Sequence, residues 1–348
     1  MSKKLKAIGL ALVIFFLLFF FIKPYNDFLT KTLKISPIVA LISMDSLKKY
    51  DNQVNILILG IAGLHYEGPD LSDSIIVASY NLSTNKLTTI SVPRDVWSDT
   101  LKDRINSAYA YGEAKQPGGG GLKLAKAEVE AIVGIPIQYA AVIDFDNFIQ
   151  FIDTIGGVDV QVDRSFTDHQ FPIPGKADDL CGGDPIFACR YETVSFQAGS
   201  QHMDGKTALN FVRSRHAEGA EGNDFARNAR QQKVIDAIKI KMIAILKSGS
   251  LKKVEEAYKT FDKSVQRDIT NQQLAIIGKN VLFKNKFSQN KIELAQDFFI
   301  VPDYLQYYGK YVLIPPNEDY TAVHGYISCE LKNPGSKSCE ALKPKQTL

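Results

Sequence analysis

The sequence predicts an α/β fold in which helices cover a central sheet, and three observations support this prediction. Residues 54–60 form a short, mostly apolar run bounded by polar residues and glycine, which is typical of a strand buried on both faces. Residues 74–80 and 86–92 are β-rich runs joined by the turn-forming residues 81–85, which indicates a hairpin. Helical and strand patterns then alternate, which favours layers of helices on a sheet.

The elements that follow the hairpin are predicted from hydrophobic spacing and from helix boundary signals. Apolar residues at helical intervals follow the four-glycine loop 118–121, and the glycine pair 156–157 ends a second helix. The expected elements are a helix at residues 122–133, a strand at 139–143, a helix at 145–155 and a strand at 158–162.

The second half of the chain predicts an insertion and then mainly helices. An insertion at about residues 163–189 leads into a β-rich piece that ends at 199. Asp204 is a good N-cap for a short helix, and Gly249 is a good stop for a long one. We expect helices at 204–212 and from Asn223 or Asp224 to 247, one or two more in 251–348, and an apolar strand at 311–314. The expected core stripe of the long helix is Phe225, Ile235, Ile238, Met242 and Leu246.

Length and charge limit the possible classes of protein. The chain has 348 residues, of which 45% are hydrophobic, so it can bury one large core or two small ones. The formal net charge of +3 is small and dispersed, whereas a nucleic-acid-binding protein presents a basic face with interleaved aromatics. We therefore expect no nucleic-acid partner.

The N-terminus predicts a membrane anchor. Lys3, Lys4 and Lys6 precede an uncharged run of Leu, Ile and Phe at residues 7–22, which Lys23 closes. The run lies between the lengths typical of a signal-peptide core and of a spanning helix, and no small-x-small cleavage site follows it. We expect an uncleaved, single-pass anchor in the cell membrane with a cytoplasmic N-terminus and an extracytoplasmic main domain. The expected segments are a tail at 1–6, the anchor at 7–22, a juxtamembrane linker at 23–53, the main domain at 54–248 and an extension at 249–348 that packs on the same domain.

The four cysteines fit an extracytoplasmic location. Cys181 and Cys189 bracket one short loop, and Cys329 and Cys339 bracket another, so each pair can close a local disulfide. Neither pair has the spacing of a zinc site. Other pairings remain open from the sequence alone.

Clustered arginines predict a phosphate-binding site. Arg94 and Arg104 lie in one short stretch, and Arg213, Arg215, Arg227 and Arg230 lie in a second, which together hold six of the nine arginines. The guanidinium fork grips phosphate oxygens two at a time, which lysine does less well. Arg227, Arg230 and Gln231 share one face near a helix N-terminus, where free N–H groups also attract anions. Surface salt bridges are the alternative.

Carboxylates beside these arginines favour a bound divalent cation. Magnesium prefers one or two carboxylates together with substrate phosphates, and Asp73 and Asp95 lie near strand ends that face a common edge. For Asp95, an ion pair with arginine is an equally good interpretation.

Eight motifs in order resemble the LytR-CpsA-Psr family of bacterial cell-envelope proteins. They fall within about residues 54–248. The matching stretches are Asn-Ile-Leu-Ile-Leu-Gly at 55–60, Ser-Asp-Ser at 72–74, Ser-Val-Pro-Arg-Asp at 91–95, Arg-Ile-Asn-Ser-Ala-Tyr at 104–109, Asp-Thr-Ile-Gly-Gly-Val-Asp-Val at 153–160, Asp-Gly at 204–205 with Ala-Leu at 208–209, Arg-Ser-Arg at 213–215, and Asp-Phe-Ala-Arg-Asn-Ala-Arg-Gln at 224–231.

The resemblance implies a three-layer α/β/α sandwich around a central mixed sheet, with a polyprenyl-pyrophosphate-linked glycan as substrate. The lipid tail would lie in an apolar tunnel, and the pyrophosphate would lie among arginines with Mg²⁺. The implied reaction moves the glycan phosphate to a hydroxyl of the peptidoglycan acceptor. Carried over by motif, the pyrophosphate clamp would be Arg94, Arg104, Arg213, Arg215, Arg227 and Gln231, with Arg230 beside them.

Within this implied site, three carboxylates have separate roles. Asp73 would be a metal ligand, and Asp224 would orient an arginine or assist removal of the acceptor proton. The family commonly has an aspartate where this chain has Ala62, so Asp70 or Glu67 would supply the second carboxylate, or Asp73 and phosphate alone would hold the metal. Asp73, Arg94, Arg213, Asp224 and Arg227 are the expected catalytic residues.

Other functions remain open at this stage. One is a non-catalytic lipid-glycan binding or scaffolding protein, and a second is a hydrolase that releases phosphate from lipid pyrophosphates. A third is a transcriptional regulator, which fits poorly with arginines placed outside the membrane. Magnesium-dependent formation of a glycan–peptidoglycan product distinguishes the transferase from the others.

Overall fold

The computed structural model describes residues 23, 26–36, 47–283, 287–294 and 296–344. The predicted anchor at residues 7–22 lies outside these ranges. Within them, no helix is both long and apolar enough to cross a bilayer.

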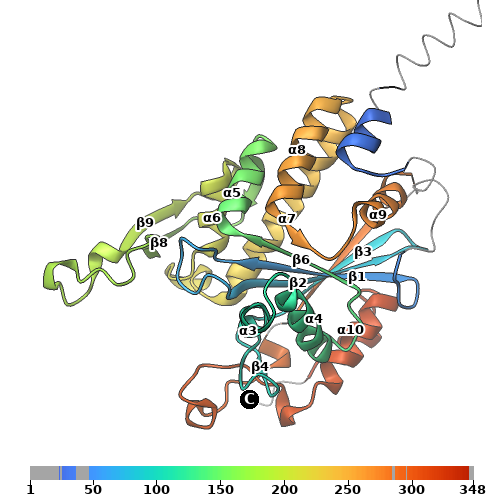
Figure 1. Cartoon of the computed structure of the whole chain (residues 1–348). Coiled ribbons are helices and arrows are strands. Elements are labelled where there is room, and N and C mark those ends of the chain that lie inside the picture. The colour runs from blue at the N-terminus through green and yellow to red at the C-terminus, as the bar shows by residue number, and fades with distance from the viewer. Residues whose placement is uncertain (1–22, 24–25, 37–46, 284–286, 295, 345–348) are drawn as a thin grey trace, which may run out of the picture.

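A six-stranded mixed sheet forms the centre of the fold (Figure 1). The strand order is β11-β6-β1-β2-β3-β12. The strands are β1 (Gln53–Ile61), β2 (Ser72–Asn81), β3 (Lys86–Ser91), β6 (Tyr139–Asp144), β11 (Gln266–Arg267) and β12 (Ser288–Glu293). β1 pairs antiparallel with β2 and parallel with β6, while β2 and β3 form the hairpin that the sequence predicts. The predicted central mixed sheet is therefore confirmed.

Helices lie on both sides of this sheet (Figure 1). On one side are α3 (Ala108–Lys115), α4 (Gly120–Val133) and α10 (Thr321–Lys332). On the other are α5 (Phe145–Thr154), α6 (Gly205–Arg213), α7 (Asp224–Lys247), α8 (Leu251–Ser264) and α9 (Asn271–Phe283). Asp144 caps α5 by accepting from Asn147 N at 2.8 Å, and Asp204 caps α6 by accepting from Thr207 N at 2.8 Å.

The two faces of the sheet are covered unequally. Leu57 and Leu59 of β1 pack into the large core beneath α3, α4 and α10. On the opposite face, Val54 packs near α9 at one end of β1. Between this cluster and the far end of the strand, Ile58 is 38% exposed although β1 has a strand on each side. An apolar strip along this face is therefore incompletely covered.

Two small sheets lie outside the central one. The predicted strand at 158–162 is β7 (Val158–Val162), which pairs with β10 (Gly199–Met203) instead of joining the main sheet. β8 (Phe166–Pro172) and β9 (Tyr191–Phe196) form a projecting hairpin, whose tip holds the Cys181–Cys189 disulfide. β4 (Trp97–Ser98) pairs with β5 (Asp103–Arg104). The remaining short elements are η1 (Phe28–Thr32), η2 (Ile105–Ser107), η3 (Cys181–Gly183), η4 (Ala188–Arg190), η5 (Gly219–Glu221), η6 (Gln296–Phe298), η7 (Tyr304–Tyr307), η8 (Pro316–Glu318) and α11 (Lys337–Glu340).

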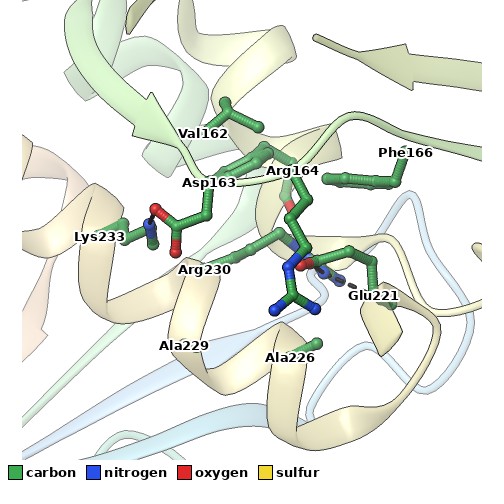
Figure 2. Close-up of a pocket in the computed structure, with 10 residues that line it drawn as sticks. Val162, Asp163, Arg164, Phe166, Glu221, Ala226, Ala229, Arg230 and Lys233 are labelled. Atoms are coloured by element: carbon green, nitrogen blue, oxygen red, sulfur yellow. Dashed lines mark hydrogen bonds and ion pairs between the residues drawn. The ribbon is translucent and has the colours of Figure 1, made fainter. Parts of the chain in front are cut away.

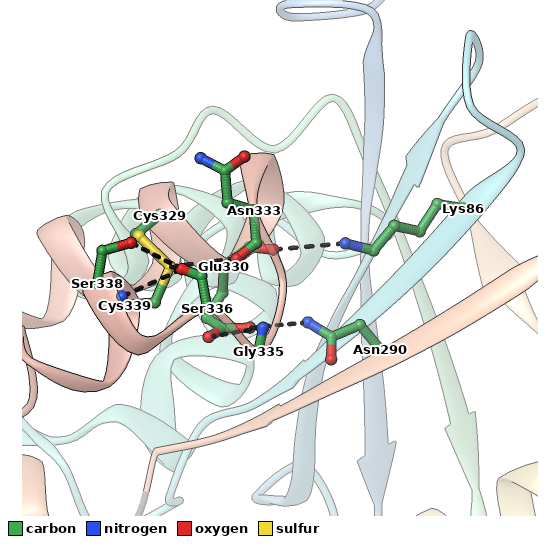
Figure 3. Close-up of a disulfide and its surroundings, with 9 residues drawn as sticks. All are labelled: Lys86, Asn290, Cys329, Glu330, Asn333, Gly335, Ser336, Ser338 and Cys339. Atoms are coloured by element: carbon green, nitrogen blue, oxygen red, sulfur yellow. Dashed lines mark hydrogen bonds between the residues drawn. A yellow bond between two sulfur atoms is a disulfide. The ribbon is translucent and has the colours of Figure 1, made fainter.

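The second disulfide fastens the end of the described chain to the sheet (Figure 3). Cys329 on α10 is bonded to Cys339 on α11, so both predicted pairings are confirmed. Between them, the Glu330 carboxylate accepts from Gly335 N at 3.0 Å and from Asn290 Nδ2 of β12 at 3.1 Å. The disulfide loop is thereby held against the edge of the central sheet.

Three expectations about the second half of the chain were wrong in whole or in part. The described part of residues 251–348 holds α8, α9 and α10 as well as the short α11, where the sequence predicts one or two helices. The predicted core stripe of α7 was right for Ile238 and Met242, which pack against the core, and wrong for Leu246, which is 40% exposed. The buried residues of the helix are centred on Val234, Ala237 and Ile245, because α7 packs toward β7 as well as toward the sheet. Residues 311–314 form only isolated bridges, and the strand that extends the sheet is β12. β12 is an edge strand with a single buried residue, Ile292, so it carries little apolar signal.

Candidate functional site

The predicted site residues lie at one edge of the central sheet. β1 and β6 are parallel, so their carboxyl ends lie together. β2 is antiparallel to β1 and begins where β1 ends, with Ser72 opposite Ile61. β3 is antiparallel to β2 and ends opposite Ile76, near the start of that strand. This topology brings Asp73 and Arg94 to the same edge, the position where open α/β sheets bind ligands.

A continuous network of ion pairs occupies this edge. The Arg94 guanidinium donates from Nη1 to Oδ1 of Asp73, and its Nε lies 3.6 Å from Oδ2 of Asp95. Arg104 Nη1 lies 3.2 Å from Oδ1 of Asp95. The carboxylate of Asp95 is therefore shared by both arginines, so the ion-pair interpretation holds for this residue. Arg104 and Asp73 are each about one third exposed, so the network faces open space.

Arg213 reaches the same edge from the end of α6. Its guanidinium carbon lies 4.7 Å from the ring centre of Phe145, 4.9 Å from that of Tyr66 and 5.2 Å from that of Phe171. Burial lowers the pKa of Arg213, and the nearby carboxylate of Asp73 partly offsets this effect. Arginine stays charged in either case, so the rings hold a cation in place beside Asp73.

Arg215 is positioned by Asp168, a residue that the sequence did not suggest. Asp168 is fully buried on β8, and its Oδ2 accepts from Ser214 Oγ at 2.7 Å, from Arg215 N at 3.0 Å and from His216 N at 3.1 Å. Its Oδ1 accepts from Gln170 N at 3.0 Å. One carboxylate thus fixes the backbone of the Arg-Ser-Arg segment. The contact joins residues 46 positions apart in a polar stretch, where no periodicity marks it.

We expect Asp168→Asn to destabilise the fold. The amide keeps one acceptor oxygen, so buried N–H groups lose their partner, at a cost of about 2–3 kcal/mol in the free energy of unfolding. Urea unfolding at neutral pH measures this loss. Asp159→Asn is the matched control, because Asp159 is an exposed aspartate whose described partner is His202. Equal stability of the two variants would contradict the assignment.

Protonation of the Asp168 carboxylate should reduce the stability of the fold at acid pH. Burial raises the pKa of Asp168, but the hydrogen bonds from Ser214, His216, Gln170 and Arg215 lower it overall below its ordinary value. A group with a lowered folded-state pKa stabilises the fold above its unfolded pKa of about 3.9, and this contribution is lost as the pH falls through the folded value. The difference between wild type and Asp168→Asn should therefore narrow below about pH 4.

The start of α7 is tied to the end of β3. The Asn223 side chain caps the helix by accepting from Ala226 N at 2.8 Å. Gln232 is buried, donates from Nε2 to Ser91 Oγ at 2.7 Å, and accepts from Thr89 Oγ1 at 3.2 Å. Ser91 lies three residues before Arg94. The bonds of Gln232 to Ser91 and Thr89 therefore hold the N-terminal part of α7 against the end of β3, close to Arg94.

The remaining predicted residues on α7 differ in what the structure shows of them. Arg227 is buried and Gln231 is partly exposed. Asp224 begins the helix, and its side chain lies outside the described part of the chain. Substrate binding by Arg227 and Gln231 and the role of Asp224 stay predictions.

Arg230 is committed mainly to other parts of the protein. Its Nε donates to Phe211 O at 2.9 Å, its Nη1 donates to the backbone and carboxylate oxygens of Glu221 at 2.9 and 2.8 Å, and its Nη2 donates to Ser214 O. It borders a small cavity of about 50 Å³ near Arg164 and Lys233 (Figure 2). These contacts favour a role in holding the Arg213–Arg215 segment, and direct substrate binding by Arg230 stays a prediction.

The donor set fits a magnesium ion held mainly by substrate. In the described part of the chain, no group of three metal-ligating side chains includes Asp73 or Asp70. Asp70 is exposed, and Ala62 is buried in an apolar cluster with Phe145 and Leu209. The carboxylate of Asp73, flanked by arginines that suit phosphate, is the arrangement that magnesium accepts when phosphate oxygens and waters complete its shell.

Sequence comparison finds curated proteins that are similar to this chain. The chain is 30% identical over 277 residues to the polyisoprenyl-teichoic acid–peptidoglycan teichoic acid transferase TagU of Bacillus mycoides, covering 77% of this chain and 76% of that protein. It is 32% identical over 200 residues to the regulatory protein MsrR of Staphylococcus aureus, covering 56% of this chain and 51% of that one.

Solved structures agree with the fold. Bacillus subtilis TagV superimposes with a TM-score of 0.56 at 24% identity, covering 81% of this chain and 98% of that one. TagT bound to LIIa-WTA superimposes with a TM-score of 0.54 at 22% identity, covering 83% and 96%. The LytR_cpsA_psr family model matches residues 27–321, most of the chain. The chain therefore belongs to the LytR_cpsA_psr family.

Proposed function

We propose that this protein is a membrane-anchored phosphotransferase that moves a glycopolymer phosphate from a polyprenyl-pyrophosphate carrier to a hydroxyl of peptidoglycan. The observation that carries the proposal is the network of Asp73, Arg94, Asp95 and Arg104, with Arg213 beside it, at the open edge of the sheet. The transferase TagU, of which the chain covers 76% at 30% identity, is named for this type of reaction.

The cationic edge suits a diphosphate. Arg94 and Arg104 come from one stretch of the chain and Arg213 from another, and Asp168 holds Arg215 next to Arg213. Guanidinium groups bind phosphate oxygens in pairs, so several forks around one edge can hold both phosphates at once.

The apolar strip supports a lipid-linked substrate. Ile58 and its register partner Ala141 on β6 are incompletely covered, and they lie on the face of the sheet opposite the large core. Gly60 follows two residues later on the same face and leads to the site edge. A prenyl chain laid along this strip would remove apolar surface from water while its diphosphate reached the arginines.

The arrangement supports attack of an acceptor hydroxyl on the glycan-linked phosphorus. The new P–O bond forms to the acceptor, the P–O bond to the lipid-linked phosphate breaks, and polyprenyl phosphate leaves. Negative charge grows on the oxygens of the leaving phosphate, so prepositioned guanidinium groups stabilise the transition state more than the ground state. The hydroxyl proton passes to a carboxylate, for which Asp224 is our candidate.

Magnesium held by Asp73 and the phosphates would add positive charge at the departing phosphate. Asp70 lies in the same loop and is our candidate for a second carboxylate, acting through water. We place the anchor at residues 7–22, with the N-terminus in the cytoplasm and the folded domain outside the membrane.

The test is a transfer assay with the purified full chain in detergent, Mg²⁺, polyprenyl-pyrophosphate-linked glycopolymer and peptidoglycan. We expect covalent glycopolymer–peptidoglycan product and one equivalent of polyprenyl phosphate. Release of polyprenyl phosphate at the same rate without acceptor would instead indicate a hydrolase. Tight binding without any product would indicate a lipid-glycan binding protein.

A further inference from the structure

An exposed patch rich in tyrosine lies on the segment 300–314. Apolar and aromatic side chains that are between 49 and 73% exposed follow one another along it. They are Ile300, Val301, Tyr304, Leu305, Tyr308 and Tyr311. A run of large apolar side chains in water is unusual on a soluble surface and marks an interaction site. We call these six residues the tyrosine patch.

The segment that carries the patch is attached directly to the candidate site. Leu313 N donates to the backbone oxygen of Asp95 at 2.9 Å, and Trp97 N donates to the backbone oxygen of Leu313 at 2.9 Å. Lys310 Nζ lies 2.6 Å from Oδ1 of Asp103, the residue before Arg104. The patch is therefore continuous with the backbone that positions the arginine network.

The patch is preorganised. Trp97 packs edge-on against Tyr307, with ring centres 5.0 Å apart, and it stacks near Tyr308 at 6.2 Å. Tyr308 has φ 57° and ψ 31°, a left-handed conformation that is strained for an aromatic residue, yet its side chain is 73% exposed. Such strain persists where the surrounding structure imposes it, and it is concentrated at functional sites.

We propose that the tyrosine patch is the docking surface for the acceptor, a glycan strand of peptidoglycan. The proposal rests on the transferase function above, which requires an acceptor hydroxyl to reach the arginine edge. A tyrosine offers a flat ring face, on which the C–H face of a pyranose can pack, and a hydroxyl that can pair with sugar hydroxyls and acetamido groups. Tyr304, Tyr308 and Tyr311 supply three such rings along one segment.

Local charge and position argue against a lipid bilayer as the occupant. Asp303 accepts from Leu305 N at 3.0 Å, and Glu318 accepts from the Tyr307 hydroxyl at 3.3 Å, so two exposed carboxylates lie in or beside the patch. The nearby cations Lys310 and Lys102 are paired with Asp103 and Asp99. These carboxylates repel anionic lipid headgroups, whereas the pyranose rings that would pack on the tyrosines carry no charge. In Figure 1 the segment lies beside β4, on the α3 and α4 side of the sheet, whereas η1, which leads from the proposed anchor, packs on α8 at the other side.

The chain contains a built-in reporter for this interaction. Trp97 is the only tryptophan in the sequence, and its ring lies against Tyr307 and Tyr308. The probe is a soluble, uncrosslinked glycan strand prepared from peptidoglycan, titrated into the full chain in detergent without lipid-linked donor. We expect a saturable change in tryptophan fluorescence.

The test variant is Tyr308→Gly. Glycine adopts positive φ without strain, and this relief offsets its greater conformational entropy in the unfolded chain, so we expect the change to remove the ring with little change in the free energy of unfolding. We expect its dissociation constant for the glycan strand to rise at least tenfold, and its KM for peptidoglycan in the transfer assay to rise in parallel, with binding of the lipid-linked donor unchanged. Tyr50→Ala is the control. Tyr50 is a tyrosine that is 54% exposed, and it lies just before the N-terminal end of β1, whereas the candidate site lies at the C-terminal end of that strand.

The outcomes separate this proposal from the function on which it rests. Equal glycan affinity in wild type and Tyr308→Gly would overturn the docking surface while leaving transfer intact. If Tyr308→Gly kept its glycan affinity but no longer bound anionic lipid vesicles, the patch would be a membrane contact and the proposal would be overturned. If the variant kept its glycan affinity but lost a dimer that wild type forms in sedimentation, the patch would contact a second copy of the chain, which would also overturn the proposal. Glycan binding that depends on Tyr308 in a chain that forms no product would support the surface and reject the transferase.

Discussion

Arg94→Ala should reduce glycopolymer transfer by at least about a thousandfold, since single arginines that stabilise phosphoryl-transfer transition states are worth roughly 10³–10⁵ in rate. Among the described residues, only Arg94 has ion pairs to both Asp73 and Asp95. Its removal eliminates one guanidinium group that can bind phosphate, and it also breaks the link between these two carboxylates. Initial rates of polyprenyl phosphate release with saturating donor measure the effect.

Two further variants make the Arg94 experiment specific. Arg94→Lys keeps the charge but loses the planar fork, so we expect an intermediate loss of transfer. Arg164→Ala removes an exposed arginine beside the Figure 2 cavity and should keep the wild-type rate. Near-ultraviolet circular dichroism checks that each variant folds. A folded Arg94→Ala protein that transfers at the wild-type rate would show that the site is elsewhere.

Asp73→Ala should remove both the activity and its dependence on magnesium. The Asp73 carboxylate is the one that lies at the sheet edge, pairs with Arg94 and influences Arg213, so it is best placed to share a metal with the diphosphate. We expect a rate loss on the order of a hundredfold or more, comparable to loss of a single preorganised electrostatic group. A titration with MgCl₂ should no longer restore the rate.

A pyrophosphate-binding measurement and two other aspartate variants serve as controls for Asp73→Ala. In calorimetric titrations, Mg²⁺ should raise the affinity of wild type for inorganic pyrophosphate. Mg²⁺ should have no such effect on the affinity of Asp73→Ala. Asp70→Ala, in the same loop, should raise the required magnesium concentration by a smaller factor, because water can replace its exposed side chain. Asp178→Ala, on the exposed hairpin, should have no effect. An unchanged magnesium titration in Asp73→Ala would reject its role as a ligand.

Much of the site could be predicted because its motifs lie next to strand ends. Asp73 is the second residue of β2 and Arg94 follows β3, so recognising a hairpin was enough to place both at one end of it. Both disulfides were predictable for a similar reason, since each closes a loop of about ten residues.

Other features depend on contacts that have no local signature. Asp168 meets Ser214 across 46 residues, and Gln232 meets Ser91 across 141. The sequence predicted that Arg227, Arg230 and Gln231 share one anion-binding face, but the structure turns Arg230 toward carbonyl groups of Phe211, Ser214 and Glu221. Helical spacing gives the face on which a residue lies but not the partner that the face meets.

By itself, the sequence determined the alternation of strands and helices, the ends of the hairpin and the chemistry concentrated at those ends, because each follows from the spacing of neighbouring residues. Only the tertiary structure decided the strand order, the incomplete cover over Ile58 and the attachment of the tyrosine patch to Asp95. These depend on packing and on hydrogen bonds between distant segments. Their free energy is gained only when the whole chain has folded, so no local pattern records them.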